Sequence, residues 1–285
     1  MTEENALIKT RWTLEELYAA KFPPRKWIID GLIYPGVSTQ FFGAGKIGKT
    51  HLMLDLALHV AYSEPDFLGL SIKKSGPVLY YMLEEEAQDL MPILQAHPLA
   101  NLNFYPESMD GQFEIETQLS LSNKEDWSRL KESCFGHILV VLDSLTSLQT
   151  RLNKSKPEDA KQIVIGLNEI ARETRCAIVF INHARKPTFV EDTLGHKASD
   201  EYEIAGTNKG AGELFDLSGG TFKLTTRSNN PRLIIQPRHA GTRIIHLKKV
   251  FRGNEPWWIA TQSRSFQKKS SQKMELFDQI SVDVE

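Results

Sequence analysis

The sequence has 285 residues, of which 41% are hydrophobic and 25% are charged, and its formal net charge at pH 7 is −2. These values are ordinary for a globular domain, alone or with appendages, and they give no global signal for nucleic-acid binding. Contact with DNA or RNA would have to come from local basic patches, or from a ring of subunits that gathers its basic side chains at the centre.

The cysteine content and the hydropathy of the chain argue against a disulfide-rich, secreted or membrane-spanning protein. The two cysteines, Cys134 and Cys176, are too few and too far apart for a disulfide framework or a metal site. No apolar run reaches membrane-spanning length, and the acidic start Met1–Asn5 is unlike a secretory signal. We therefore expect a cytoplasmic protein with no membrane partner.

Residues 1–36 are expected to form a lead-in segment. Thr13–Leu17 has the capping-box pattern that opens a short helix, and Pro23-Pro24 ends it. The apolar stretch Trp27–Leu32 would then bring large side chains against the domain. The segment could serve packing alone, or it could also shape a binding pocket or contact a neighbouring subunit.

The run Gly43–Thr50 matches the pattern G-x-x-x-x-G-K-[ST] of a phosphate-binding P-loop. It follows the strand formers Val37–Phe42 and precedes a helical pattern over His51–Tyr62, which is the context that the motif requires. Glycines let several backbone N–H groups point at one anion, and the start of the helix adds its positive dipole end. Lys49 would reach the β- and γ-phosphates, and the Thr50 hydroxyl would hold Mg²⁺. We place the nucleotide contacts at Gly43, Ala44, Gly45, Lys46, Ile47, Gly48, Lys49, Thr50 and His51.

An acidic run follows the next predicted strand. Val78–Leu83 is a continuous apolar stretch of buried-strand length, and it ends in Glu84, Glu85 and Glu86. The carboxyl ends of strands beside a P-loop strand are where α/β sheets place their chemistry. One of these acids, chiefly Glu84, could activate the water that attacks the γ-phosphate. Alternatively, all three cap the helix predicted to begin at Ala87.

Two further buried strands end in polar side chains. His137–Leu142 leads into Asp143, the Walker-B arrangement in which a carboxylate binds the Mg²⁺ held by the P-loop hydroxyl; the alternative is a solvated Asp at an ordinary strand end. Ala177–Ile181 leads into Asn182 and His183, which could sense the γ-phosphate or make only a local hydrogen bond.

Two polar segments could contact a polyanion. The first, Ser144–Pro157, is predicted to be a loop, and a solvated loop without a partner is an equal alternative. The second, residues 184–207, is longer than most loops of a compact domain, and such loops are usually functional or disordered. Their basic and histidine side chains are Arg151, Lys154, Lys156, Arg185, Lys186, His196 and Lys197.

The last third of the chain predicts an antiparallel extension of a parallel sheet. Its strands are expected at Phe222–Thr226, Arg232–Gln236, Thr242–Val250 and Trp257–Ile259. Helices are predicted over Asp126–Glu132 and from Pro157 onward, and a short edge strand at Phe104–Tyr105. The domain organisation is therefore a lead-in segment (1–36), an ATPase domain (37–261) and a flexible or helical tail (262–285).

The order of these motifs resembles that of a RecA-fold ATPase. Within that fold, residues 25–260 most resemble the RepA-type hexameric replicative helicases of plasmids and the wider AAA-25 family. The resemblance implies an α/β fold, a RecA-like P-loop NTPase with a mostly parallel central sheet, helices on both faces and antiparallel strands at the C-terminal edge. The motifs that carry it are Gly43–Thr50, Tyr80–Glu85, Val140–Ser144, Ile163–Ile181, Asn182–Lys186 and Lys209–Leu214.

The resemblance also implies a role for individual residues. Lys49 and Thr50 would bind phosphate and Mg²⁺, and Asp143 would support the same ion. Glu84 would activate water and His183 would sense the γ-phosphate, although Asn182 stands where the family has a second His.

The basic finger that a neighbouring subunit would insert has candidates in two stretches of the chain. Lys209 stands where RepA-type proteins have Arg, and Lys supplies the charge without the planar, bidentate fork. Lys249 and Arg252 are the candidates in Lys249–Gly253, a stretch similar to a signature of RadA-type ATPases.

We expect an ATP-hydrolysing, ring-forming motor that uses ATP and Mg²⁺ and binds single-stranded DNA. It would assemble as a homo-oligomer, and the resemblance implies a hexamer. A replicative helicase of a plasmid, phage or mobile element fits best. The alternative is a DNA-binding ATPase that uses ATP as an assembly or regulatory switch without unwinding. A small-molecule kinase is disfavoured, because the arginines near the P-loop lie only upstream, at Arg25 and beyond.

Overall fold

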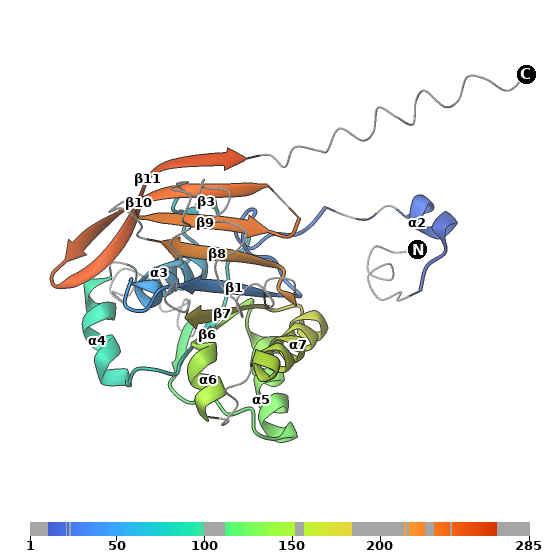
Figure 1. Cartoon of the computed structure of the whole chain (residues 1–285), viewed down its shortest axis with the longest axis horizontal. Coiled ribbons are helices and arrows are strands. Elements are labelled where there is room, and N and C mark those ends of the chain that lie inside the picture. The colour runs from blue at the N-terminus through green and yellow to red at the C-terminus, as the bar shows by residue number, and fades with distance from the viewer. Residues whose placement is uncertain are drawn as a thin grey trace, which may run out of the picture.

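The structure is a computed structural model, and it describes residues 11–20, 22, 24–97, 99, 112–151, 157–183, 214, 217–225, 231–239 and 241–266. Its described strands form one nine-stranded sheet in the order β11-β10-β9-β8-β1-β7-β6-β4-β5, and a two-stranded ribbon of β2 and β3 (Figure 1). The expectations for Phe104–Tyr105, for residues 184–207 and for residues 267–285 lie outside the described residues.

The sheet has a parallel part and an antiparallel part. β8, β1, β7, β6, β4 and β5 pair in parallel, whereas β8, β9, β10 and β11 pair antiparallel. The expected mostly parallel sheet with antiparallel strands at its C-terminal edge is thus confirmed. The strands are β1 Ser38–Gly43, β4 Val78–Met82, β5 Phe113–Glu116, β6 Leu139–Asp143, β7 Ala177–His183, β8 Gly220–Thr225, β9 Arg232–Pro237, β10 Thr242–Arg252 and β11 Glu255–Phe266, with β2 Asp66–Phe67 and β3 Leu70–Ser71 in the ribbon.

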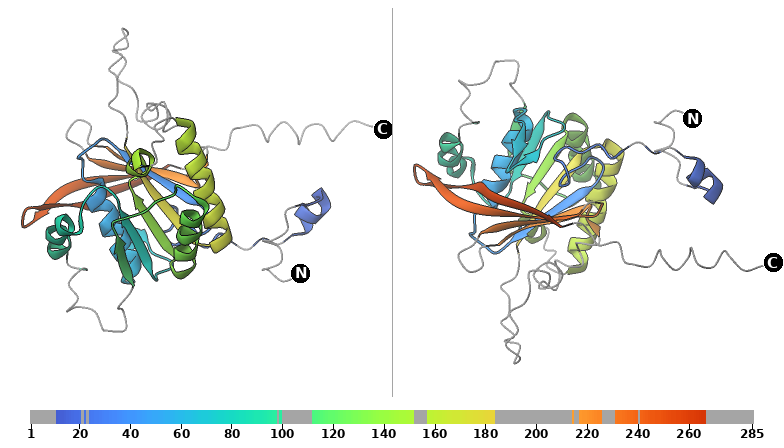
Figure 2. Two further views of the ribbon diagram at one scale, coloured as in Figure 1. Left: turned by 90° about the horizontal axis from the view of Figure 1, so that it is seen from below. Right: turned by 90° about the horizontal axis from the view of Figure 1, so that it is seen from above.

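Helices cover both faces of the sheet, and Figure 2 shows α3 and α7 on opposite sides of it. Alternate residues of the buried strands point to opposite faces: in β6, Leu139 and Val141 pack with α3, whereas Val140 and Leu142 pack with α7. Because both faces are covered, the buried strands appear in the sequence as continuous apolar runs. The helices are α2 Leu14–Ala19, α3 Lys49–Ala61, α4 Ala87–Ala96, α5 Lys124–Gly136, α6 Leu145–Arg151 and α7 Pro157–Thr174. None of the helices in these described ranges is long and apolar enough to span a bilayer.

The described part of the lead-in segment has the predicted local structure. Thr13 caps α2, its hydroxyl accepting from the Glu16 N–H while the Glu16 carboxylate accepts from the Thr13 N–H, and so the capping box is confirmed. Further on, Ile28, Ile29 and Ile33 are fully buried in the core.

The prediction of a loop over Ser144–Pro157 is wrong for its first half. Leu145–Arg151 forms α6, because Leu145 and Leu148 lie one helical turn apart and are both fully buried in the core beside α7. The polar composition of the segment concealed this pair of anchors.

Strand β5 was not predicted, and β11 is longer than expected. Phe113 and Ile115 pack on the core while Glu114 and Glu116 are exposed, so the alternation of β5 is only four residues long. β11 continues to Phe266 because it pairs with β10 along that strand's whole length, so its last residues lie beyond position 261, where the tail was expected to begin.

Replacing Leu148 tests the anchoring of α6. Leu148→Ala removes a fully buried side chain, so the free energy of unfolding should fall by about 2–5 kcal/mol. Urea denaturation measures this change. Leu17→Ala, a partly exposed leucine of α2, is the matched control and should change it by less than about 1 kcal/mol. Equal effects of the two substitutions would show that α6 is not anchored in the core.

Candidate functional site

The P-loop connects β1 to α3 through backbone that requires glycine. Gly48 has φ 93°, a left-handed conformation at the residue that caps α3, and a Cβ there would lie 3.0 Å from the Trp258 Nε1. A Cβ on Gly43 would come within 2.7 Å of the Ile47 Cδ1. At Gly45, by contrast, an added Cβ would meet no atom within 4 Å. The loop is thus closely packed at Gly43 and Gly48 and open at Gly45, where an anion could approach its backbone.

Lys49, the first residue of α3, folds its side chain back over the loop. Its ammonium donates to the Ala44 carbonyl at 2.8 Å and to the His183 Nδ1 at 3.1 Å. Burial lowers the pKa of Lys49, while the nearby Asp143 and Glu84 carboxylates oppose that shift. A positive charge that has lost much of its hydration is a strong partner for an incoming phosphate.

The Thr50 hydroxyl and the Asp143 carboxylate meet, although 93 residues separate them. Thr50 Oγ1 donates to Asp143 Oδ2 at 2.8 Å, and the buried Tyr80 hydroxyl donates to the same oxygen at 3.0 Å. Burial raises the pKa of Asp143 to about 6, although both hydrogen bonds act in the opposite direction. A carboxylate and a hydroxyl are oxygen ligands of the kind that Mg²⁺ prefers, so this donor set fits the ion implied by the motif.

Glu84 follows β4, and three donors surround one of its oxygens. The Ser144 hydroxyl, the Ser147 hydroxyl at 2.8 Å and the His183 Nε2 at 3.0 Å all contact Glu84 Oε1. The His183 bond is the largest cause that lowers the pKa of Glu84 to about 2, and the two serines add to it. Glu84 is therefore held as a carboxylate.

The sheet explains why these groups converge. β1, β7, β6 and β4 are adjacent and parallel, so their carboxyl ends lie at one edge. Gly43 pairs with His183 in β7, and Met82 of β4 pairs with Asp143 in β6. The structure thus brings together five of the residues singled out from the sequence: Lys49, Thr50, Glu84, Asp143 and His183.

Three other candidates are Lys209, Arg252 and His51. Lys209 is outside the described residues. Arg252 ends β10, where its guanidinium lies 6.0 Å from the centre of the Trp257 ring in β11. His51 contacts the same hairpin, its Nε2 lying 2.8 Å from the Glu255 Oε2, and the Trp258 Nε1 donates to the Gly48 carbonyl at 3.4 Å. The β10–β11 hairpin therefore packs against the start of the P-loop helix.

Tyr80, Ser144 and Ser147 belong to the site but were not singled out as site residues. A tyrosine in an otherwise apolar buried strand was the available signal for Tyr80, because a buried phenol needs a hydrogen-bond partner. For the serines the sequence held no comparable signal, since α6 itself was not predicted.

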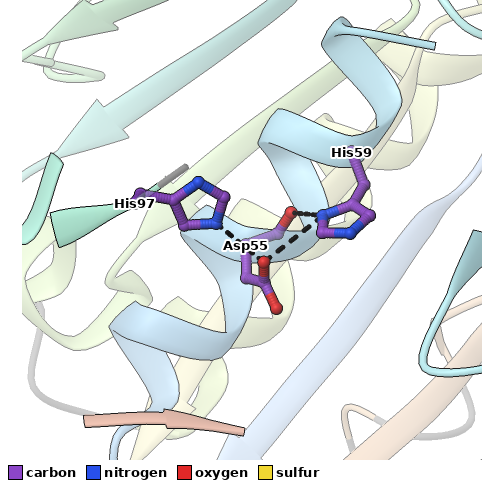
Figure 3. A group of neighbouring side chains, drawn as sticks. All are labelled: Asp55, His59 and His97. Atoms are coloured by element: carbon purple, nitrogen blue, oxygen red, sulfur yellow. Dashed lines mark hydrogen bonds and ion pairs between the residues drawn. The ribbon is translucent and has the colours of Figure 1, made fainter. Parts of the chain in front are cut away.

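A second polar cluster lies at the middle of α3 (Figure 3), where Asp55, His59 and His97 bring three ligand-type atoms within 4.8 Å of one another. Leu99 N–H donates to the His97 Nδ1, so we assign the proton of this ring to Nε2, which donates to Asp55 Oδ1 at 2.7 Å. The His59 Nδ1 lies 2.7 Å from the Asp55 backbone oxygen and therefore also carries a proton. Because both nitrogens that face the cluster are donors, we interpret it as a clamp between α3 and the end of α4, not a metal site.

The comparisons with known proteins agree with this fold. The chain matches the model of a family described as AAA domain (AAA-25) over residues 2–188, more than half of its length, and it belongs to that family. It is a RecA-fold P-loop ATPase.

Two solved structures have a similar fold. One is a KaiC-like protein from the archaeon Pyrococcus horikoshii OT3, with a TM-score of 0.54 and 14% identity over 82% of this chain and 94% of that one. The other is the RadB recombinase, with a TM-score of 0.48 and 20% identity over 81% of this chain and 93% of that one. At 14% identity the first structure supports the fold of this chain and nothing finer. The TM-score of the second is too low to add to that.

Asp55→Asn tests the clamp through the pH dependence of stability. The pKa of Asp55 is lowered in the folded state. Its contribution to stability is therefore complete above its reference pKa of 3.8 and is lost as the pH falls through the pKa of the folded state. The pKa of His59 is raised in the folded state. Its contribution to stability is therefore complete below its reference pKa of 6.5 and is lost as the pH rises through the pKa of the folded state. Between these two values the substitution should lower the free energy of unfolding by about 1–3 kcal/mol.

Urea denaturation of both proteins at about pH 5 and about pH 9 measures this difference, which should shrink at the higher pH. The exposed Glu132→Gln in α5 is the control and should have a small effect at both. A difference that does not change with pH would contradict the contribution of the Asp55–His59 pair, and no difference at either pH would contradict the clamp.

Proposed function

We propose that this protein hydrolyses ATP with Mg²⁺ at the common edge of β1, β4, β6 and β7. The observation that carries the proposal is the 2.8 Å contact between the Thr50 hydroxyl and the Asp143 carboxylate, beside the Lys49 ammonium. Thr50 and Asp143 would hold the ion, which would neutralise charge on the β- and γ-phosphates. The loop faces open space at Gly45, where phosphates could approach its backbone.

Phosphate binding would change the contacts of Lys49. Its ammonium would leave the Ala44 carbonyl and the His183 Nδ1 for the β- and γ-phosphates, which are stronger acceptors because they are charged. The negative phosphates would also hold Lys49 in its charged form, against the effect of burial.

Glu84 would act on the attacking water. Lys49 donates to the His183 Nδ1, so we assign the ring proton to Nε2, which donates to Glu84. When Lys49 moves to the phosphates, His183 Nδ1 would lose its donor, so the ring would keep only one of its two contacts, the Nε2 donation to the base. His183 would thus couple the presence of the γ-phosphate to the position of Glu84.

Glu84→Gln separates binding from hydrolysis. The amide keeps the shape of the side chain but cannot accept a proton from water, so turnover should fall by about 10²–10⁴-fold while ATP still binds. Turnover is measured by phosphate release and binding by calorimetry. Glu85→Gln is the matched neighbour and should retain turnover; the opposite pattern would assign the base to Glu85.

For the biological activity, we propose a ring-forming motor on single-stranded DNA, in the manner of a RepA-like replicative helicase. The tip of the β10–β11 hairpin supports a contact between subunits, because Lys248, Lys249 and Arg252 are all exposed there. A cleft of about 1250 Å³ beside Glu84 offers the complementary charge, since carboxylates line it and Arg129 is its only basic residue among those described. Lys249 or Arg252 of a second copy, or Lys209, would complete the transition-state charge.

The second candidate is a DNA-binding ATPase that uses ATP as an assembly switch. The contacts His51–Glu255 and Gly48–Trp258 favour it, because they link the P-loop helix directly to the exposed hairpin. Nucleotide binding at Thr50 could then move a surface through which copies of the chain assemble.

Strand displacement separates the two candidates. A labelled DNA fork is incubated with the protein and ATP, and native mass spectrometry with ATP and single-stranded DNA reports the assembly. A ring that displaces the strand supports the motor, whereas DNA-bound assemblies without displacement support the switch. Lys49→Ala should abolish turnover and displacement, and Lys124→Ala, on the exposed start of α5, should not. Unchanged turnover in Lys49→Ala would refute both candidates.

A further inference from the structure

The first turn of α6 faces the carboxylate of Glu84. Ser144 precedes the helix and Ser147 lies in its first turn, and both hydroxyls donate to Glu84 Oε1. The Ser147 N–H donates to the Ser144 Oγ at 3.3 Å, which ties the two serines together. Leu145 and Leu148 fix the helix in the core on its other side. The two hydroxyls therefore approach Glu84 from a rigid element.

All hydrogen bonds from described residues to the Glu84 carboxylate end on the same oxygen. His183 supplies the third donor to Oε1, at 3.0 Å, from the end of β7. An oxygen that already accepts three donors has no capacity left to take a proton from water, because its lone pairs are engaged. This leaves Oε2 as the oxygen for the attacking water, and the donors on Oε1 determine the direction in which Oε2 points.

Ser147 differs from the other two donors. Ser144 is fully buried beside Asp143, the proposed Mg²⁺ ligand, and His183 also contacts Lys49. The Ser147 hydroxyl contacts only Glu84 and the Ser144 hydroxyl among the described residues, at 2.8 Å and 3.3 Å. Alanine would be the better residue for the helix itself. The hydrogen bond to Glu84 is thus the main interaction that the Ser147 hydroxyl makes.

We propose that Ser147 is a positioning residue for the catalytic base, which orients Glu84 so that Oε2 meets the attacking water. The inference rests on the proposed ATP hydrolysis and adds a residue to it. Among the described residues Ser147 contacts neither Lys49 nor Thr50, the proposed ligands of phosphate and Mg²⁺, so it should affect the chemical step and not the binding of ATP.

Ser147→Ala should lower kcat for ATP hydrolysis about three- to thirtyfold, with KM within about twofold of the wild type, because one of three restraints on a charged group is lost. Ser147→Thr keeps the hydroxyl and should restore most of kcat. Ser128→Ala, at an exposed position of α5, is the matched control and should leave kcat unchanged. Melting temperatures of all variants should agree, which a structural role of Ser147 would not allow.

A double-mutant cycle shows whether Ser147 acts through Glu84. In the Glu84→Gln background, adding Ser147→Ala should change the residual kcat by less than about twofold. An equal loss in both backgrounds would overturn the proposal, as would an unchanged or raised kcat in Ser147→Ala, or a rise of KM that accounts for the whole effect.

Failure of the two proposals can be told apart. If the wild type hydrolyses ATP and Lys49→Ala does not, but Ser147→Ala matches the wild type, only the role of Ser147 is wrong. If the wild type does not hydrolyse ATP, the proposed function and the role of Ser147 are both overturned.

Discussion

The hydrogen bond between Thr50 and Asp143 is the contact on which the rest of the site depends. It joins the end of one parallel strand to the helix that follows another, across 93 residues of sequence. Only a sheet in which β1, β7, β6 and β4 are neighbours with the same direction brings these groups to one edge. The buried strands therefore serve both as the core of the domain and as the supports of its polar site.

Burial raises the pKa of both carboxyl groups and hydrogen bonds lower it, but the balance differs between Asp143 and Glu84. Asp143 is almost fully buried, and its pKa is raised to about 6, so it is mostly charged in neutral solution and a bound cation would favour the charged form further. Glu84 is partly exposed and accepts three donors, which hold its pKa at about 2. The two acids thus suit different tasks, one as a ligand and the other as a charged group that acts on water.

The sequence predicted the ends of the strands better than the surroundings of the site. Glu84, Asp143 and His183 could be found because each follows an apolar run, and the P-loop because its glycines are set by backbone conformation. Tyr80, Ser144 and Ser147 could not be assigned to the site, because their partners are distant in sequence and hydroxyl contacts have no fixed spacing. α6 and β5 were missed for a related reason: each depends on only two apolar side chains that pack on the core, Leu145 and Leu148 or Phe113 and Ile115. Such short patterns do not differ from those of a loop until the tertiary partners are known.

The most direct test of the account is a crystal structure with a non-hydrolysable ATP analogue and Mg²⁺. The account predicts one cation bound to the Thr50 hydroxyl at about 2.1 Å, with Asp143 in its coordination sphere directly or through a water. It also predicts the Lys49 ammonium on the β- and γ-phosphates and the Glu84 carboxylate near a water in line with the γ-phosphate. A nucleotide bound elsewhere, or a cation that leaves Thr50 and Asp143 without a shared role, would contradict it.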